Sequence, residues 1–217
     1  MVHDQAKKLD NRPPQIRKHF SDLIKFFKAR VSKDETLLEA GCGGSFMLPW
    51  QSKAAKMVVG IDFSDSEIAE SSRFVKKRRL NNVVIEQQDF FHMPPGYVGH
   101  FNIICLFSNT LGNFEDLRKV ELLRSFTEAL KDGGRIFLHL YDETPASRKV
   151  RIEYYERMGL ENVHYERSEK AIYYNGICSD CFSEEKIQEL TKLAGLELTE
   201  CVHRDIGYFV VLTKPSA

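Results

Sequence analysis

Two acidic residues and a cluster of glycines have the spacing of a nucleotide-binding turn. Glu39 stands directly before the run Ala-Gly-Cys-Gly-Gly, which contains Gly41 and Gly43, and Asp62 ends the next apolar run. Glycine lets the backbone approach a ligand closely, and a carboxylate about 20 residues later can bind both hydroxyls of a ribose. The pattern therefore predicts a site for a cofactor that contains adenosine.

The residues around the turn distinguish between cofactors. A dinucleotide site has a third glycine, or an alanine, at the position that Phe46 occupies here. The carboxylate of Glu39 would repel a diphosphate and would attract a cation. A tight turn without a ligand is the alternative, but the placement of Asp62 favours a binding site. These features favour a positively charged cofactor over NAD.

Short apolar runs alternate with amphipathic segments through the first two thirds of the chain. This alternation predicts an open, doubly wound α/β sheet of Rossmann-like type, mostly parallel. Asp132-Gly133-Gly134 is expected to end its last helix. The predicted strands are 36–40, 57–61, 83–89, 101–107 and 135–141, and the predicted helices include 64–79 and 115–130.

The C-terminal third of the chain breaks this alternation. Residues 142–182 are charged and rich in tyrosine, and we expect a helix followed by a strand or hairpin. Ser183 is expected to cap a helix. Two strands then follow with so short a link that they must form an antiparallel hairpin. The chain is thus predicted to be a single domain, 1–217, with a helical cap (1–34), a cofactor-binding core (35–141), a substrate lid (142–182) and a C-terminal helix and hairpin (183–217).

The run from Glu39 to Ser45 resembles the first motif of the class I S-adenosylmethionine-dependent methyltransferases. That motif is an acid, any residue and then Gly-x-Gly-x-Gly, whose last glycine is Ser45 here. A parallel sheet that ends in an antiparallel hairpin is also the outline of this family. The resemblance covers residues 35–141 and 183–214, and it implies a methyl-transferring enzyme with S-adenosylmethionine as its cofactor.

The resemblance also implies which residues contact the cofactor. Asp62 would bind the ribose, Phe63 would lie against the adenine, and Asp89 would accept a hydrogen bond from the adenine amino group. A solvated acid at a strand end is the alternative for Asp89. The expected cofactor contacts are Glu39, Ala40, Gly41, Cys42, Gly43, Asp62, Phe63, Asp89, Phe90 and Phe107.

The loop from Phe107 to Phe114 would lie beside the transferred methyl group. It lacks the Asn-Pro-Pro-aromatic run of nucleic-acid amino methyltransferases and loosely resembles the Gly-Asn-Ser-aromatic stretch of methyltransferases that act on glycine and related amines. A small-molecule acceptor is therefore predicted, with nitrogen ahead of oxygen. Asn109, Tyr141 and His139 could orient this acceptor or act as a base. A turn role for Asn109 and a core role for His139 stay open.

Aromatic side chains on the lid could form the acceptor pocket, which would suit a cationic or an aromatic acceptor. Ordinary core packing is the alternative for each of them. Arg17, His19 and Phe20 could close over the cofactor from the N-terminal helix. The lid residues in question are Tyr154, Tyr155, Tyr173 and Tyr174.

The charge balance and the hydropathy of the chain limit the classes of partner that it is expected to bind. Lys plus Arg and Asp plus Glu each number 31 in 217 residues, and this balance disfavours a nucleic-acid substrate. No apolar stretch approaches the roughly 20 residues of a membrane helix, and no apolar signal opens the chain, so we expect a cytoplasmic protein without membrane contact. The lone pair Cys178 and Cys181 predicts no metal site.

Two other functions stay open on the sequence. The first is a methyltransferase that acts on a protein or RNA side chain. The second is a catalytically silent subunit that binds S-adenosylmethionine and serves as a scaffold for a partner. An NAD-linked oxidoreductase is the weakest option because of Phe46.

Overall fold

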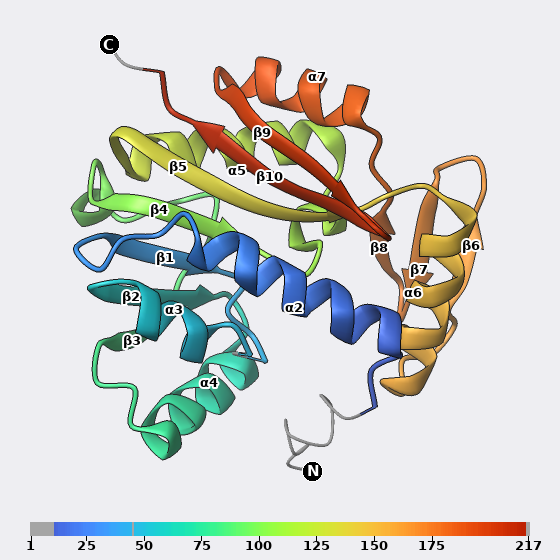
Figure 1. Cartoon of the computed structure of the whole chain (residues 1–217), viewed down its shortest axis with the longest axis horizontal. Helices are drawn as coiled ribbons and strands as arrows, with labels where there is room; N and C mark the ends of the chain where they lie inside the picture. The colour runs from blue at the N-terminus through green and yellow to red at the C-terminus, as the bar shows by residue number, and fades with distance from the viewer. Residues whose placement is uncertain (1–10, 45, 216–217) are drawn as a thin grey trace.

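The computed structural model describes residues 11–44 and 46–215. Ser45, the last position of the glycine motif, lies outside this range. The first ten residues, which the prediction about a signal segment concerns, also lie outside it. The remaining chain forms one seven-stranded sheet in the order β3-β2-β1-β4-β5-β10-β9 (Figure 1). Its strands are β1 Thr36–Ala40, β2 Met57–Asp62, β3 Val83–Gln87, β4 Phe101–Leu106, β5 Leu130–Tyr141, β9 Glu197–Arg204 and β10 Gly207–Thr213.

The sheet confirms the predicted Rossmann-like fold class. The first five strands pair in parallel, with β1 between β2 and β4. β10 pairs antiparallel with both β5 and β9, so the C-terminal hairpin enters the sheet with its second strand inside. The carboxyl ends of β1, β2 and β4 therefore meet at one edge, and the residues that follow these strands are brought together there.

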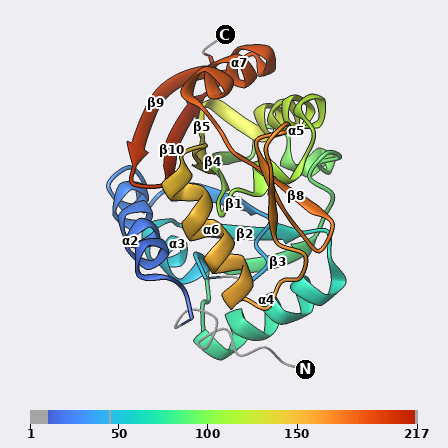
Figure 2. The same ribbon diagram turned by 90° about the vertical axis from the view of Figure 1, so that its right-hand side faces the viewer.

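Helices cover both faces of the sheet, as Figures 1 and 2 show. One core joins the sheet to α5 and α7 through side chains such as Phe126 and Leu190. The other joins the opposite face to α2 and α3 through side chains such as Phe27 and Leu48. The helices are α2 Pro14–Lys28, α3 Leu48–Ala54, α4 Asp65–Arg78, α5 Asp116–Ala129, α6 Pro145–Arg157 and α7 Glu184–Ala194, with short 3-10 turns at η1 Pro95–Tyr97 and η2 Thr110–Asn113.

The segment 142–182 forms more structure than a helix and a hairpin. After α6 it folds into a separate sheet of β6 His164–Glu166, β7 Ala171–Tyr174 and β8 Ile177–Asp180. This sheet and α6 lie beyond the carboxyl ends of the parallel strands (Figure 1). The segment is therefore placed where a lid over the ligand edge would have to be.

The predicted helix end at Asp132-Gly133-Gly134 was wrong. The helix α5 already ends at Ala129, and β5 begins at Leu130, which pairs with Phe101. The register between β4 and β5 shifts just after this pair, and Gly133 adopts φ +69° within the strand. The glycines thus allow an irregular start of a strand, a position that glycine also favours.

Among the helices within the described residues, none combines the length and the apolar character that a membrane span requires.

Candidate functional site

A small cavity lies directly on the glycine turn after β1. Its volume is about 140 Å³. The turn contributes glycine backbone, α3 contributes the beginning of a helix, and the end of β4 contributes Phe107. The cavity is lined by Glu39, Gly41, Cys42, Gly44, Phe46, Met47, Leu48, Phe107 and Ser108.

Glu39 gives this cavity a carboxyl group that has no cation beside it. The residue is 5% exposed, and Gln51 donates a hydrogen bond to its Oε2. Burial raises the pKa of Glu39 well above its usual value. No Lys, Arg or His nitrogen of the described residues lies within ion-pair distance of it. A cationic ligand would compensate a buried carboxyl of this kind, and the contact of Glu39 with the cofactor stays a prediction.

Asp62 is held in place by the backbone of the same turn. Gly43 donates its backbone N–H to Oδ2 at 3.0 Å, and Ser64 donates to Oδ1 at 3.1 Å. The side chain is buried at the carboxyl end of β2. A Cβ at Gly43 would lie 3.5 Å from Oδ2 and 3.2 Å from Glu67. The turn and the carboxylate therefore form one unit, and its orientation depends on glycine.

The expected adenine contacts lie on the same edge. Phe90 is buried, and the centroid of its ring is 6.1 Å from that of Phe63, which is 68% exposed. Asp89 follows β3 and is exposed, and its carboxylate accepts hydrogen bonds from His92 and from the backbone of Phe91, which lower its pKa. The geometry thus places an exposed ring and an acid with a lowered pKa at the neighbouring carboxyl ends of β2 and β3, and their contact with adenine stays a prediction.

A larger cavity of about 390 Å³ adjoins the first one. Both cavities are lined by Ser108, and Phe46 of the first packs edge-on against Phe20 of the second with ring centroids 4.9 Å apart. Ser108 belongs to the loop that was predicted to lie beside the transferred methyl group, but it was not among the predicted site residues, although it follows the end of β4 as ligand-contacting residues often do. The larger cavity is lined by Phe20, Ser108, Tyr141, Tyr154, Tyr155, Met158, Gly159, Leu160 and Tyr174.

The lid contributes tyrosines to this cavity, but not all those that were predicted. Tyr154 and Tyr155 come from α6 and Tyr174 from β7. Tyr173 points elsewhere, because its ring stacks on His164 and its hydroxyl donates to Glu169. Neighbouring residues of a strand point to opposite faces, so only one residue of the Tyr173–Tyr174 pair can line the cavity.

Asn109 connects the lid to the sheet. Its side chain is fully buried, and its Nδ2 donates to Ser179 Oγ and to the carbonyl of Asp180, both at 3.0 Å. Its Oδ1 accepts the backbone N–H of Tyr141 at 2.9 Å. Ser108 and Asn109 both have positive φ, which asparagine tolerates better than most residues. These contacts favour the turn role, in which Asn109 positions Tyr141 and β8.

His139 lies behind Tyr141 rather than in the cavity. It is fully buried, and its Nε2 is 2.9 Å from Nε2 of His19, which is buried on α2. Burial lowers the pKa of His139 well below its usual value and that of His19 to about 4. The pair therefore shares one hydrogen bond between two neutral rings and links α2 to β5. Neither ring lines the cavities, so the core role for His139 is the better supported one.

The histidine pair predicts an acid-sensitive fold. A histidine whose folded pKa is about 4 contributes stability that is present above pH 6.5 and is lost as the pH falls through 4. At pH 5, His19 alone should account for about 2 kcal/mol of lost unfolding free energy relative to neutral pH. Urea unfolding at pH 7 and pH 5 measures this loss. Between pH 7 and pH 5, the free energy of unfolding should fall by about 2 kcal/mol less in His19→Phe than in the wild type. Equal decreases in the two proteins would contradict the assignment of His19 as a buried, neutral histidine.

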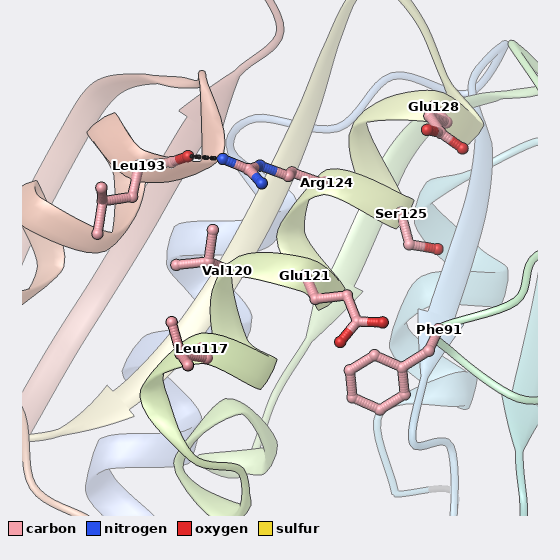
Figure 3. A pocket seen from close by; sticks show the side chains of 8 residues that line it. All are labelled: Phe91, Leu117, Val120, Glu121, Arg124, Ser125, Glu128 and Leu193. Atoms are coloured by element: carbon pink, nitrogen blue, oxygen red, sulfur yellow. Dashed lines mark hydrogen bonds between the residues drawn. The ribbon is translucent and has the colours of Figure 1, made fainter.

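A third cavity, of about 380 Å³, lies away from the glycine turn, between α5, α7 and the loop after β3. Figure 3 shows Phe91, Leu117 and Val120 around it, and the guanidinium of Arg124 donates to the carbonyl of Leu193 at 2.8 Å. It has neither the glycine backbone nor the buried acid of the first cavity. The two joined cavities at the carboxyl edge are therefore the candidate active site.

Comparison with protein families gives an independent result. Residues 12–201 match the family model described as a methyltransferase domain. No curated protein matches the chain. The family match covers all the strands of the parallel sheet and the whole segment 142–182.

Solved structures with the same fold include several methyltransferases. A SAM-dependent methyltransferase from Aquifex aeolicus has a TM-score of 0.68 at 18% identity and covers 97% of this chain and 97% of its own. A second, from Clostridium acetobutylicum, has a TM-score of 0.65 at 15% identity, with 92% of each chain covered. A third structure is the 1,6-didemethyltoxoflavin-N1-methyltransferase of Burkholderia thailandensis, solved with 1,6-didemethyltoxoflavin and S-adenosylhomocysteine. Its TM-score is 0.66 at 11% identity, and the match covers 90% of this chain and 77% of the other.

Proposed function

The chain belongs to the methyltransferase-domain family, and from that premise we propose that it transfers a methyl group from S-adenosylmethionine to a small-molecule acceptor. The protein is an enzyme of this class, and its cofactor is S-adenosylmethionine. The observation that carries the proposal is the junction at Ser108 of two cavities, one built on glycine backbone and a buried acid, the other walled by aromatic lid residues.

The residues of the first cavity fit the cofactor. The uncompensated carboxyl of Glu39 matches a ligand with sulfonium and ammonium groups, and the glycine backbone leaves room beside Asp62. Glu39, Ala40, Gly41, Cys42, Gly43 and Phe107 would hold its methionine end, Asp62 its ribose, and Phe63, Asp89 and Phe90 its adenine. When bound, the cofactor supplies a methyl group that its sulfonium already activates.

The acceptor cavity favours alignment over acid–base catalysis. Its volume is within the range of small-molecule sites, about 300–1,000 Å³. Among residues 11–44 and 46–215, no carboxylate, histidine or lysine lines it, and burial raises the pKa of Tyr141 well above its usual value. An acceptor atom that is nucleophilic as bound, such as a neutral amine nitrogen, suits this site better than a hydroxyl that must be deprotonated. Nitrogen is therefore our preferred acceptor.

The role that remains for the protein is to exclude water and to orient the acceptor. Phe20, Tyr154 and Tyr155 form apolar walls, and Tyr141 presents the end of β5 to the cavity. Asn109 contributes through the backbone of Tyr141, which it fixes. His139 supports the same strand from behind.

Calorimetric titration tests the cofactor and the class of enzyme together. We expect saturable binding of S-adenosylmethionine and S-adenosylhomocysteine and no binding of NAD in the same buffer. Turnover is then measured by the release of S-adenosylhomocysteine with a panel of small amines and hydroxylated acids. Binding of NAD alone would contradict the assignment of the glycine turn, and binding without turnover on any acceptor would favour the scaffold function.

Replacing Asp62 by alanine should weaken cofactor binding by about 1.5–3 kcal/mol, the scale of hydrogen bonds to a charged group. This corresponds to a dissociation constant raised about 10- to 150-fold in the same titration. The matched control is Asp65→Ala, because Asp65 stands three residues later at the beginning of α4 and lines neither cavity. Equal affinities of the two variants would show that Asp62 does not hold the ribose.

A further inference from the structure

Arg12 is a buried cation at the junction of the two cavities. The residue is 8% exposed, and its Cζ lies 4.8 Å from the ring centroid of Phe20, 4.5 Å from that of Phe46 and 5.8 Å from that of Tyr154. Phe46 lines the cofactor cavity, whereas Phe20 and Tyr154 line the acceptor cavity. The guanidinium is thus packed among the rings that separate the two sites.

This cation has no anionic partner within residues 11–44 and 46–215. No carboxylate there forms an ion pair with Arg12, and its Nε is buried without a hydrogen-bond acceptor. Buried charges in proteins are normally paired. The faces of three aromatic rings and a hydrogen bond with Tyr154 compensate the charge only in part, because none of these groups carries a full negative charge. The guanidinium of Arg12 would therefore be stabilised by a ligand that brings a negative charge.

A second guanidinium strengthens the positive potential of the acceptor cavity. Arg151 is fully buried on α6, and its Cζ lies 4.7 Å from the ring centroid of Tyr141, which lines the cavity. It donates to the neutral acceptors Ser179 O at 2.9 Å and Cys181 Sγ at 3.0 Å. The nearby carboxylate of Asp180 does not compensate it, because that group binds Lys119 and Lys186.

We propose that the acceptor carries a carboxylate, which Arg12 binds, on an aromatic or apolar body that fills the tyrosine-lined cavity. This inference rests on the proposed function and makes its substrate class specific. Arginine binds carboxylates with two parallel hydrogen bonds, and the bond strengthens where water is excluded. The aromatic walls alone would suit a cationic acceptor equally well, but two guanidinium groups, with no lining carboxylate in the part of the chain that the structure describes, disfavour a cationic acceptor.

The test uses matched probes on the full chain saturated with S-adenosylhomocysteine. The probes are 2-aminobenzoate, its neutral carboxamide, benzylammonium and acetate, each titrated calorimetrically. We expect 2-aminobenzoate to bind at least about tenfold more tightly than the carboxamide or acetate, and benzylammonium not to bind. Arg12→Met should remove this preference and leave carboxamide binding unchanged. The matched control is Arg78→Met, because Arg78 also lies near a phenylalanine ring, Phe74, but is exposed at the end of α4 and lines neither cavity.

Three outcomes would overturn the proposal. The first is equal or tighter binding of the carboxamide or of benzylammonium, and the second is no binding of 2-aminobenzoate up to its solubility limit. The third concerns the carboxylate of the cofactor itself. If Arg12 binds that group, Arg12→Met will weaken S-adenosylhomocysteine and spare 5′-methylthioadenosine, which lacks the amino-acid end. A wild type that binds no S-adenosylhomocysteine at all would instead refute the proposed function.

Discussion

Valine in place of Gly41 should raise the dissociation constant for S-adenosylmethionine by about 100-fold or more. Gly41 has φ +71°, a conformation that costs a β-branched residue about 1–2 kcal/mol. A Cβ at this position would also lie 3.1 Å from Cγ2 of Thr110. The strain and this close contact force the turn to move. Because Gly41 lines the cofactor cavity, the movement occurs where the ligand must approach the backbone closely. Titration with the cofactor measures the effect.

A matched glycine separates backbone strain from the loss of the site. Gly133 has φ +69°, and a Cβ there would meet no atom within 4 Å. Gly133→Val should therefore lose stability by a similar strain and keep the affinity of the wild type for the cofactor. Circular dichroism and urea unfolding establish that both variants are folded at the temperature of the titration. Wild-type affinity in a folded Gly41→Val protein would refute the close approach of the cofactor to this turn.

The second large effect is expected at Lys119. This lysine is 1% exposed on α5, where its Nζ binds Asp180 of β8 and lies 2.7 Å from Oδ1 of Asp116. Lys186 of α7 lies 3.1 Å from Asp180 and completes the network. Lys119→Met should lower the free energy of unfolding by about 3 kcal/mol, because it leaves the largely buried carboxylate of Asp180 with only half of its compensation. Urea unfolding at neutral pH measures the loss.

The same network offers its own control. Lys186→Met removes a cation from the same two acids, but the Lys186 side chain is 28% exposed, so we expect a loss below about 1 kcal/mol. Hydrogen exchange adds a local measurement, since the amides of β7 and β8 should exchange faster in Lys119→Met than in Lys186→Met. Equal stabilities of the two variants would show that burial of the Lys119 pair contributes nothing.

The parts of this protein that depend on local sequence were predictable. The strand that contains Glu39 and the strand that ends at Asp62 are short, mostly apolar runs, and the glycines between them permit the tight turn that a close ligand requires. The fold class and the cofactor follow from this motif, from the alternation of strands and helices and from the C-terminal hairpin. For the same reason the error at Gly133 was local, since glycine favours both a helix end and an irregular strand.

The contacts that shape the acceptor side were not predictable in this way. His19 pairs with His139 across 120 residues, and Lys119 pairs with Asp180 across 61. Periodicity indicates that such residues are buried but does not indicate their partners. Tyr173 and Tyr174 have the same chemistry, and only the register of β7 against its neighbours decides that Tyr174 faces the cavity. Arg12 is likewise a functional candidate only once the structure shows that it is buried among aromatic rings and forms no ion pair with a described carboxylate.

The attachment of the segment 142–182 has a consequence for the evolution of this enzyme. Asn109 and Lys119 fix only its β8 end to the sheet, whereas the tyrosines that face the acceptor lie mainly on α6 and β7. Substitutions at Tyr154 or Met158 can therefore exchange one acceptor for another without disturbing the anchor or the glycine turn, whereas Tyr155 and Arg151 hydrogen-bond Ser179 and belong to the anchor. Selection, or an engineer, can thus retune acceptor choice within this one helix while the machinery for methyl donation is inherited unchanged.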